Sequence, residues 1–423
     1  MFLSLTYGEV LQPLVAEVEQ QIKNKHAEIE QRIDRNQFRV LQSFQHNKVS
    51  DSHFIPSTGY GYDDYGRDTL EKIYAEVFGA EAGLVRPQII SGTHAISIAL
   101  FGVLRPGDEL LYITGKPYDT LEEIVGLRGK GTGSLKEFGI TYNSVDLCED
   151  GRVDFQKVSK AMKANTKMIG IQRSKGYATR PSFTVAEIKE MIQYVKEINP
   201  EVVVFVDNCY GEFVEDIEPC HVGADLMAGS LIKNPGGGLV KTGGYIVGKQ
   251  QWVDACSYRL TSPGIGAEAG ASLYSLLEMY QGFFLAPHVV GQALKGAVFT
   301  AAMLERVGMN SNPKWDSKRT DLIQSVQFDD RDKMVAFCQA IQFASPINSH
   351  VTPYPAYMPG YEDDVIMAAG TFIQGASIEL TADGPTRSPY VAYVQGGLTY
   401  SHVKMAICIA LNSLLEKGLV QLK

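Results

Sequence analysis

A regular alternation of short apolar runs with amphipathic stretches constrains the fold more than any other feature of this chain. The apolar runs lie at residues 83–90, 109–113, 139–147, 167–172, 202–206, 225–231 and 244–247. The stretches between them carry apolar residues at helical spacing, as in "TVAEIKEMIQYVKEI", which opens with a capping box formed by Thr184 and Glu187. Such alternation predicts an α/β fold in which helices cover both faces of a mostly parallel, seven-stranded sheet.

The two ends of the chain follow different patterns. Apolar residues recur at helical spacing through residues 9–44, which predicts one long amphipathic helix. Its apolar stripe needs a partner, and the sequence leaves open whether that partner is its own chain or a second subunit. Residues 266–306 are predicted to be helical and to lead away from the sheet.

The C-terminal third mixes predicted strands and helices. The predicted elements are strands at 322–328, 371–380 and 390–395 and helices at 331–343 and 401–417. These elements indicate a smaller α+β domain. The predicted organisation is therefore a helical arm at residues 1–55, a large domain at 56–285 and a small domain at 286–423.

Composition excludes several classes of partner. The chain has 39 Lys and Arg against 48 Asp and Glu, a net charge of −9, which argues against a nucleic-acid surface and favours a small-molecule ligand. Its six cysteines form no C-x-x-C pair, so neither a zinc cluster nor a disulfide framework is expected. No basic signal segment and no apolar run of ~18 residues is present, so we expect a cytoplasmic protein with no membrane association.

Two charged residues follow apolar runs that we predict to be buried strands. Asp207 ends the run in "EVVVFVDNCYGEF", and Lys233 ends the next one in "DLMAGSLIKNPGGG". Ligands of open α/β sheets bind beyond the carboxyl ends of the strands, so both residues are expected to face one cleft. A lysine that forms a Schiff base and an acid that protonates a pyridine nitrogen are the groups that pyridoxal phosphate requires. The alternatives are a solvated Lys233 and an Asp207 paired with another cation.

A candidate phosphate site lies in "QIISGTHAISIAL". We predict that a strand ends at Ser91, that Gly92 and Thr93 turn the chain, and that a helix opens at His94. Free amides and the positive helix end attract an anion, although many such helix starts bind nothing. Ser230 could add a hydroxyl to the same phosphate.

Tyr118, in "GKPYDTLEE", is placed to stack on a flat aromatic ring. Rival motifs fail. "GGGLVKT" lacks the glycine that a P-loop needs before Lys241, "GKGTGS" lacks the dinucleotide-binding spacing, and neither H-E-x-x-H nor G-x-S-x-G occurs.

These motifs, in this order, resemble the cystathionine lyase and methionine gamma-lyase family of fold type I pyridoxal phosphate enzymes. The likeness runs from about residue 57 to the C-terminus through "YGRDTLEKIYAEVFGAEAGLV", "SGTHAI", "PYDTL", "VDNCYGEF" and "GSLIKNPGG", and it is greatest to the branch known as aluminium-resistance proteins. The resemblance implies that Lys233 holds pyridoxal 5'-phosphate as a Schiff base. It also implies that Asp207 pairs with the ring nitrogen, that Gly92 and Thr93 hold the phosphate, and that Tyr118 stacks on the ring.

The same resemblance implies an oligomer. In the family a Tyr-x-Arg pair, here Tyr65 and Arg67, reaches the cofactor phosphate of a neighbouring subunit, which implies a dimer or a tetramer with active sites at the interface. Arg387 would clamp the carboxylate of the substrate. Ile232 and Asn234 replace the residues that usually flank the family's lysine. The resemblance therefore predicts neither the details of phosphate binding nor the substrate of this chain.

The resulting hypothesis is β- or γ-elimination from a cystathionine- or methionine-like amino acid. Lys233 would remove the Cα proton, and Tyr118 or Tyr65 would protonate the departing thiolate. Burial and cationic neighbours are expected to lower the pKa of Lys233. The alternatives are an aldolase or aminotransferase with the same cofactor, a non-catalytic binding protein of the same fold, and a nucleotide-binding protein.

Overall fold

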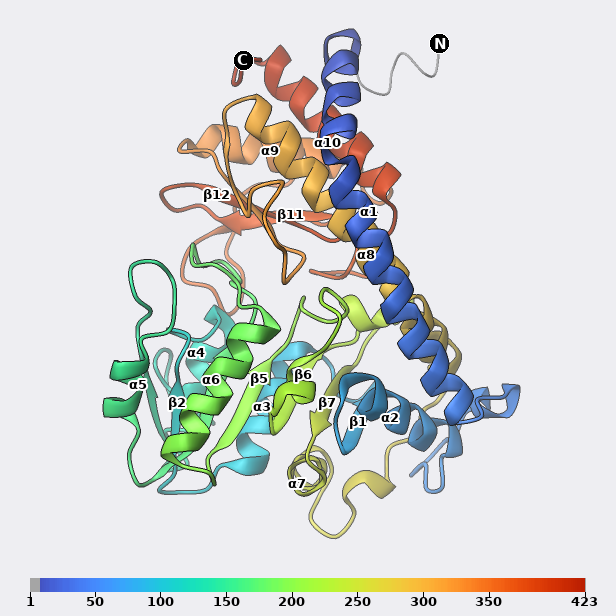
Figure 1. The fold of residues 1–423 in the computed structure, drawn as a ribbon, viewed down its shortest axis with the longest axis vertical. Coiled ribbons are helices and arrows are strands. Elements are labelled where there is room, and N and C mark those ends of the chain that lie inside the picture. Colours follow the sequence, from blue (N-terminus) through green and yellow to red (C-terminus); the bar gives the residue numbers. More distant parts are fainter. Residues whose placement is uncertain (1–7, 423) are drawn as a thin grey trace.

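The protein contains two β-sheets that are connected by a long helix (Figure 1). The structure is a computed structural model, and it describes residues 8–422. The helices are α1 (Gly8–His46), α2 (Tyr65–Phe78), α3 (Gly92–Val103), α4 (Asp119–Val125), α5 (Phe155–Ala161), α6 (Val185–Ile198), α7 (Gln250–Leu260), α8 (Leu276–Arg306), α9 (Arg331–Phe343) and α10 (Tyr400–Glu416).

The larger sheet has seven strands in the order β1-β7-β6-β5-β4-β2-β3. The strands are β1 (Ala82–Arg86), β2 (Glu109–Tyr112), β3 (Thr141–Ser144), β4 (Thr166–Gln172), β5 (Val203–Asp207), β6 (Leu226–Ser230) and β7 (Gly244–Gly248). Strands β2 to β6 pair in parallel, whereas β7 is antiparallel to both β6 and β1. The prediction of a mostly parallel, seven-stranded sheet is confirmed.

Alternate side chains of the central strands enter two separate cores. Val204 and Val206 pack into the core that contains residues of α2 and α6, and Val203 and Phe205 pack into the core that contains residues of α3 and α7. A strand that is buried on both faces needs apolar residues at every position, which is why "VVVFV" reads as a continuous apolar run. The helices therefore cover both faces, as predicted.

The smaller sheet has five antiparallel strands in the order β10-β11-β12-β9-β8. The strands are β8 (Asn310–Asn312), β9 (Gln324–Gln327), β10 (Val365–Ala368), β11 (Thr381–Pro385) and β12 (Val391–Gln395). Helix α9 spans the predicted residues, and α10 begins and ends within one residue of its prediction. The smaller α+β part predicted for the C-terminal third is present.

The predicted strand at 371–380 is wrong. This segment is a loop, and the strand begins only at Thr381. The Glu379 carboxylate accepts the backbone N–H groups of Phe372 (2.9 Å) and Ile373 (2.8 Å), which folds the segment back on itself, and Gly375 has a φ of +97°. Strands β8 and β10 were not predicted, because neither has an alternating apolar pattern long enough to stand out.

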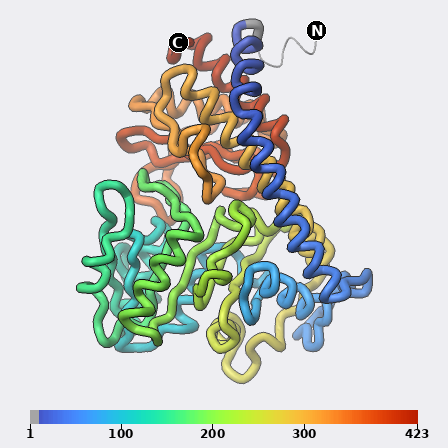
Figure 2. Tube along the Cα trace, viewed as in Figure 1, coloured from blue at the N-terminus to red at the C-terminus, as the bar shows by residue number. Residues whose placement is uncertain are grey.

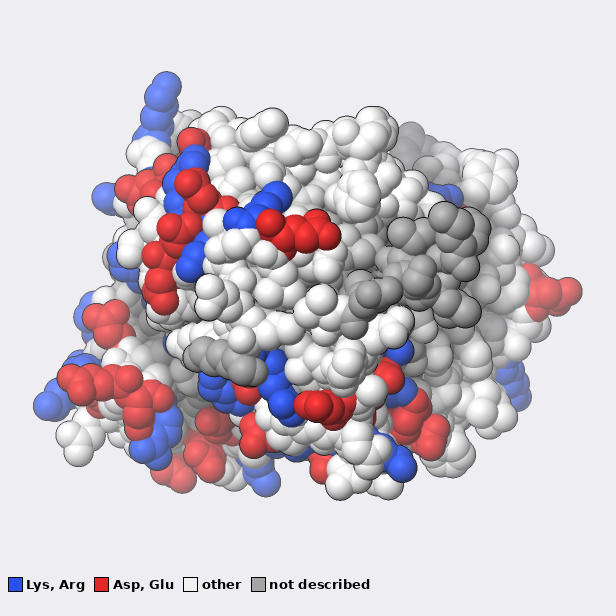
Figure 3. Space-filling model, turned by 90° about the horizontal axis from the view of Figure 1, so that it is seen from above, with Lys and Arg blue, Asp and Glu red and all other residues white. Residues whose placement is uncertain are grey.

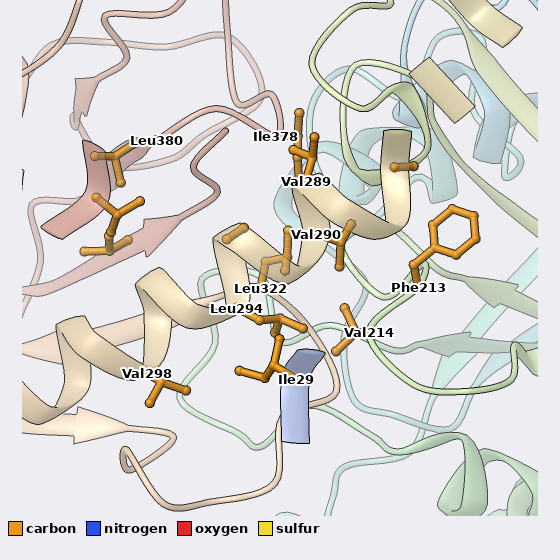
Figure 4. Close-up of a cluster of buried hydrophobic side chains, with 14 of the residues drawn as sticks. Ile29, Phe213, Val214, Val289, Val290, Leu294, Val298, Leu322, Ile378 and Leu380 are labelled. Carbon is orange, nitrogen blue, oxygen red and sulfur yellow. The ribbon is translucent and has the colours of Figure 1, made fainter. Parts of the chain in front are cut away.

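Helix α1 packs along its own chain. Its apolar stripe is buried in the core that also contains residues of α8, and Figure 2 shows the helix running diagonally along the molecule. The buried residues of the stripe are Leu11, Val15, Val18, Ile22, Ile29, Ile33 and Val40. Figure 4 shows Ile29 beside Leu294 of α8 and Val214 of the large-sheet part. Of the two partners that the sequence left open, the structure shows the body of the same chain.

Helix α8 crosses from one part of the molecule to the other. It contacts α2 on the side of the large sheet and β8, β9 and α10 on the side of the small sheet. The predicted domain boundary at residues 285 and 286 falls inside this continuous helix.

The described surface carries no extended field of one charge on the face drawn in Figure 3, where acidic and basic side chains lie intermixed. Within residues 8–422, none of the helices combines the length and apolar character that a membrane span requires.

Gly291 of α8 is expected to be essential for the close approach of α1. A Cβ atom at this position would overlap the side chain of Ile33. Gly291→Ala should therefore lower the free energy of unfolding by about 1–3 kcal/mol, although alanine in an unobstructed helix would raise it by about 1 kcal/mol. Chemical denaturation measures the effect, and Ile33→Ala should make the same glycine substitution neutral or favourable. An equal cost of Gly291→Ala in both backgrounds would contradict this packing.

Candidate functional site

A cavity of about 220 Å³ lies where the carboxyl ends of the large-sheet strands meet the small sheet. Among the residues that line it are Ser91, Gly92, Thr93, Tyr118, Asp207, Ser230 and Lys233, all of which the sequence predicted as site residues. The small sheet contributes Asp383, Tyr393 and Gln395 to the opposite wall.

Asp207 and Lys233 reach the cavity from neighbouring strands. Strands β5 and β6 pair in parallel with Asp207 opposite Ala228, so both chains leave the sheet at the same edge. Beyond β6 the backbone turns into a short 3-10 helix at Asn234–Gly236, and Lys233 precedes its first residue. The Lys233 Nζ atom lies 4.0 Å from the centroid of the Tyr210 ring. Within residues 8–422, no carboxylate comes close enough to form an ion pair with this amine.

Burial and neighbouring charges affect the pKa values of Asp207 and Lys233 differently. Burial raises the pKa of Asp207, although the Lys233 ammonium and the Cys209 N–H, which donates to Asp207 Oδ1 (3.1 Å), oppose the increase. Burial alone would lower the pKa of Lys233, but Cys209, Tyr210, Asp207 and Glu212 together outweigh it and raise that pKa. The predicted decrease is therefore wrong, because acidic rather than cationic side chains surround the amine. In the chain alone Lys233 is an ammonium at neutral pH.

The start of α3 forms the polar floor of the cavity. The Ser91 hydroxyl caps the helix by accepting the His94 N–H (3.0 Å), which leaves the N–H groups of Gly92 and Thr93 without an acceptor in the described chain. A Cβ atom at Gly92 would lie 3.1 Å from Cys209 Sγ and 3.2 Å from the Ser230 Cβ, so glycine permits this close approach. The strand predicted to end at Ser91 ends instead at Arg86, and a turn and a bend cover residues 87–89.

Tyrosines form another part of the cavity wall. The Tyr118 and Tyr361 hydroxyl groups are 2.6 Å apart, and the Tyr177 ring centroid lies 5.6 Å from that of Tyr361 and 5.0 Å from that of Tyr393. Sequence reasoning found only Tyr118, because Tyr177 and Tyr361 lie in irregular loops where no periodic pattern marks them. Burial raises the pKa of Tyr118 well above its ordinary value, so its phenol retains the proton at neutral pH.

Two buried carboxyl groups near Lys233 were also missed. Asp383 of β11 is 1 % exposed and lines the cavity. Glu212 lies outside the cavity wall, where one of its oxygens accepts the Tyr245 hydroxyl (2.6 Å) and burial raises its pKa to about 8. An aspartate inside a strand signals a special environment, but the strand that holds Asp383 was assigned to the wrong residues.

Three predicted site residues lie away from this cavity. Tyr65 is 58 % exposed at the start of α2, and the buried Arg67 guanidinium donates to the backbone oxygens of Gly61 (2.6 Å) and Gly270 (3.1 Å). Their predicted contact with a neighbouring subunit stays a prediction, although the Arg67 donors already have partners. Arg387 pairs with Asp363 (2.9 Å) and lines an adjoining cavity, which shares Tyr118, Gln172 and Tyr177 with this one. Its predicted role as a carboxylate clamp stays a prediction.

Arg173 is a buried ionic centre behind the cavity. Its guanidinium pairs with Glu215 (3.1 Å) and Glu218 (3.2 Å) and donates to Asn208 Oδ1 (2.8 Å). Because Asn208 directly follows Asp207, this network fixes the backbone that carries the acid. The neighbouring Ser174 lines the cavity and donates to Asp321 Oδ2 (2.6 Å).

Comparisons with known proteins give a family match and close relatives. The family model for methionine gamma-lyase matches residues 11–415. The Bacillus subtilis protein YnbB is 76 % identical over 421 residues, which cover 99 % of this chain and 100 % of YnbB. The crystal structure of a carbon-sulfur lyase involved in aluminum resistance from Clostridium novyi NT has a TM-score of 0.93 at 47 % identity, with 97 % of each chain covered.

A more distant structure supports the fold assignment. The pyridoxal-5'-phosphate-dependent protein YhfS of Escherichia coli has a TM-score of 0.62 at 17 % identity and covers 92 % of this chain and 97 % of its own. At this identity the likeness concerns the fold alone. It agrees with the fold type I architecture expected from the sequence.

Loss of the Arg173 guanidinium should destabilise the protein strongly. Arg173→Met leaves the wholly buried Glu218 without its ion pair, so we expect the free energy of unfolding to fall by about 3–5 kcal/mol in chemical denaturation. Arg152→Met, which breaks an exposed pair with Asp150, is the matched control and should leave the unfolding midpoint unchanged. Similar midpoints for the two variants would show that the buried network does not stabilise the fold.

Proposed function

We propose that this chain, which belongs to the methionine gamma-lyase family, is a pyridoxal 5'-phosphate-dependent carbon–sulfur lyase that acts on a sulfur amino acid. The observation that carries the proposal is the meeting of the Lys233 amine and the Asp207 carboxylate in one cavity. The cavity also contains an anion-binding helix start and a tyrosine wall. Each of these groups is common alone, but together they match the functional groups of a single cofactor.

The residues present fit that cofactor. Lys233 would hold it covalently, Asp207 would pair with the ring nitrogen, and Tyr118 would stack on the ring. The free N–H groups of Gly92 and Thr93 and the Ser230 hydroxyl would bind the phosphate, since a helix N-terminus favours a dianion. When bound, the cofactor supplies an electron-withdrawing ring that stabilises negative charge at the Cα of an amino acid.

The side chains of this chain would then move protons. The Lys233 amine, released by the incoming amino acid, is positioned to accept the Cα proton. Tyr118, protonated at neutral pH and hydrogen-bonded to Tyr361, is positioned to protonate the departing sulfur. Tyr65 of a neighbouring subunit is the other candidate for this step. Whether the bond breaks at Cβ or at Cγ depends on the substrate, and an aldolase or aminotransferase would use the same lysine and acid.

The visible spectrum should reveal the covalent link. We expect purified protein to be yellow, to lose this colour on borohydride treatment and to gain the mass of the reduced cofactor at Lys233. Lys233→Ala should show neither the colour nor the added mass and should release no thiol or ammonia. Lys241→Ala, at an exposed residue nearby, is the matched control and should behave as wild type. A Lys233→Ala protein that kept full turnover would rule out the proposed function.

We further propose that the protein is a homo-oligomer. Two segments held together by backbone hydrogen bonds, Gly270 to Tyr60 (2.8 Å) and Leu273 to Ser57 (3.1 Å), present exposed apolar side chains. These are Ile55, Tyr60, Tyr62, Tyr65, Leu273, Tyr274 and Leu277. A patch of this kind on a folded chain is typical of an interface. It includes the Tyr65 that was predicted to reach a neighbouring active site.

Charge inside this patch should dissociate the oligomer. The double variant Tyr274→Glu/Leu277→Glu places two carboxylates where contact would desolvate them, so sedimentation should show a monomer with greatly reduced turnover. Phe343→Glu alters an exposed phenylalanine at the end of α9 and should leave the assembly intact. A wild-type protein that sediments as a monomer at micromolar concentration would exclude the proposal.

A further inference from the structure

The cavity contains a buried carboxylate that the proposed chemistry does not use. Asp383 extends from β11 into the wall opposite Lys233 and is 1 % exposed. Tyr177 donates its hydroxyl to Asp383 Oδ2, and Gln395 Nε2 donates to Oδ1 (3.2 Å). Both donors are neutral, and no cationic side chain in residues 8–422 forms an ion pair with Asp383.

The charge balance of the cavity isolates this carboxylate. The only charged side chains on the described wall are Lys233, Asp207 and Asp383, and no arginine is present. In the chain alone the single Lys233 ammonium stands against both acids, and it opposes the increase in the pKa of Asp383 that burial causes. A cofactor attached to Lys233 and paired with Asp207 would engage both of those groups. Asp383 would then remain as a buried anion that faces the substrate.

A buried anion without a countercharge is costly, and this one lies among apolar and aromatic side chains such as Ile323, Met367 and Tyr393. A substrate with a methyl group at this wall would not reduce the unfavourable free energy of the buried anion. A substrate with a carboxylate there would increase it. A substrate that brought an ammonium would remove it. The two neutral donors fix the direction of the carboxylate and leave its charge uncompensated.

We infer that Asp383 determines specificity by pairing with a second ammonium group of the substrate, carried on the part that leaves with the sulfur. The substrate is thus a thioether amino acid with a cationic amine beyond the sulfur atom, rather than one with a plain alkyl group as in methionine. Tyr177 and Gln395 are positioning residues for this carboxylate. The inference rests on the proposed function, because the lysine and the first acid are assigned there to the cofactor.

Two synthetic substrates of equal length test the inference. S-(2-aminoethyl)-L-cysteine and S-propyl-L-cysteine differ only in a terminal ammonium or methyl group. Wild type should use the aminoethyl compound with a kcat/KM about 10- to 100-fold higher, as expected for a buried charge-assisted hydrogen bond. The difference should lie in KM, because the contact is made equally before and during bond cleavage. Asp383→Asn should remove the preference, and Asp332→Asn, at an exposed aspartate, should retain it.

Binding without turnover separates this inference from the proposed function. L-lysine and L-2-aminoheptanoate have the same shape as the two substrates but no sulfur to expel, and calorimetry measures their affinity for the cofactor-loaded protein. Wild type should bind L-lysine at least about 10-fold more tightly than L-2-aminoheptanoate. Asp383→Asn should bind the two compounds equally. Equal affinities in wild type would overturn the role of Asp383 and leave the lyase proposal standing. A clear preference for L-lysine with no turnover of any thioether would overturn the lyase proposal alone.

If Asp383 had only a structural role, the preference for the ammonium substrate would not follow the titration of its carboxylate. The pH dependence of this preference therefore tests the assignment. Burial raises the pKa of Asp383, so the preference for the ammonium should fade as the pH falls and the carboxylate takes up a proton. The other titratable groups that interact with Asp383 are Lys233, Tyr118, Tyr177, Tyr210, Tyr361, Tyr393 and Cys338. In all seven the pKa is raised, so none titrates near pH 6.

Tyr177→Phe keeps the carboxylate and removes one of its donors, so it serves as a second variant if Asp383→Asn folds poorly. The Tyr177 hydrogen bond opposes the increase in the pKa of Asp383, so its loss should move the midpoint of the pH dependence above that of wild type. A preference for the ammonium that did not vary between pH 5 and pH 8 in either protein would overturn the assignment.

Discussion

The site depends on the parallel pairing of β5 and β6. Because neighbouring parallel strands end at the same edge of a sheet, this pairing brings an aspartate and a lysine that are separated in sequence to one cavity. Charged groups at strand ends normally face water, but here the small sheet covers them. The removal of water makes each remaining charge costly, and it also makes each pairing in the cavity selective.

The acid and the lysine are held by different means. The segment after β5 is fixed by the buried Arg173 network, in which two glutamates and Asn208 surround one guanidinium. The segment after β6 is fixed by a short 3-10 helix, where the Asn234 side chain donates to the Glu212 backbone oxygen (2.9 Å). Both supports lie behind the cavity, so they orient the reactive groups without occupying the space that a ligand needs.

The sequence revealed the large sheet well because buried parallel strands are uninterrupted apolar runs, and Asp207 and Lys233 each stand where such a run ends. The sequence did not indicate that Asp383 belongs to the site. The segment before this residue has the composition of a strand, but a side-chain carboxylate that captures two backbone amides turns it into a loop. Tyr177 and Tyr361 lie in loops. Tertiary contacts determine the positions of these loops, and no sequence pattern marks such contacts. The raised pKa of Lys233 was missed because the groups that raise it all lie in residues 207–212, and the sequence analysis placed only Asp207 of these beside the amine.

The long α1–α8 contact has a mechanical consequence. The two helices run side by side past both sheets, with Ile33 seated against Gly291, so a large rotation of the small sheet relative to the large one would have to shear this packed seam. Cores packed at crystalline density resist such sliding. The seam therefore favours movement of the two sheets as a single rigid frame around the cavity.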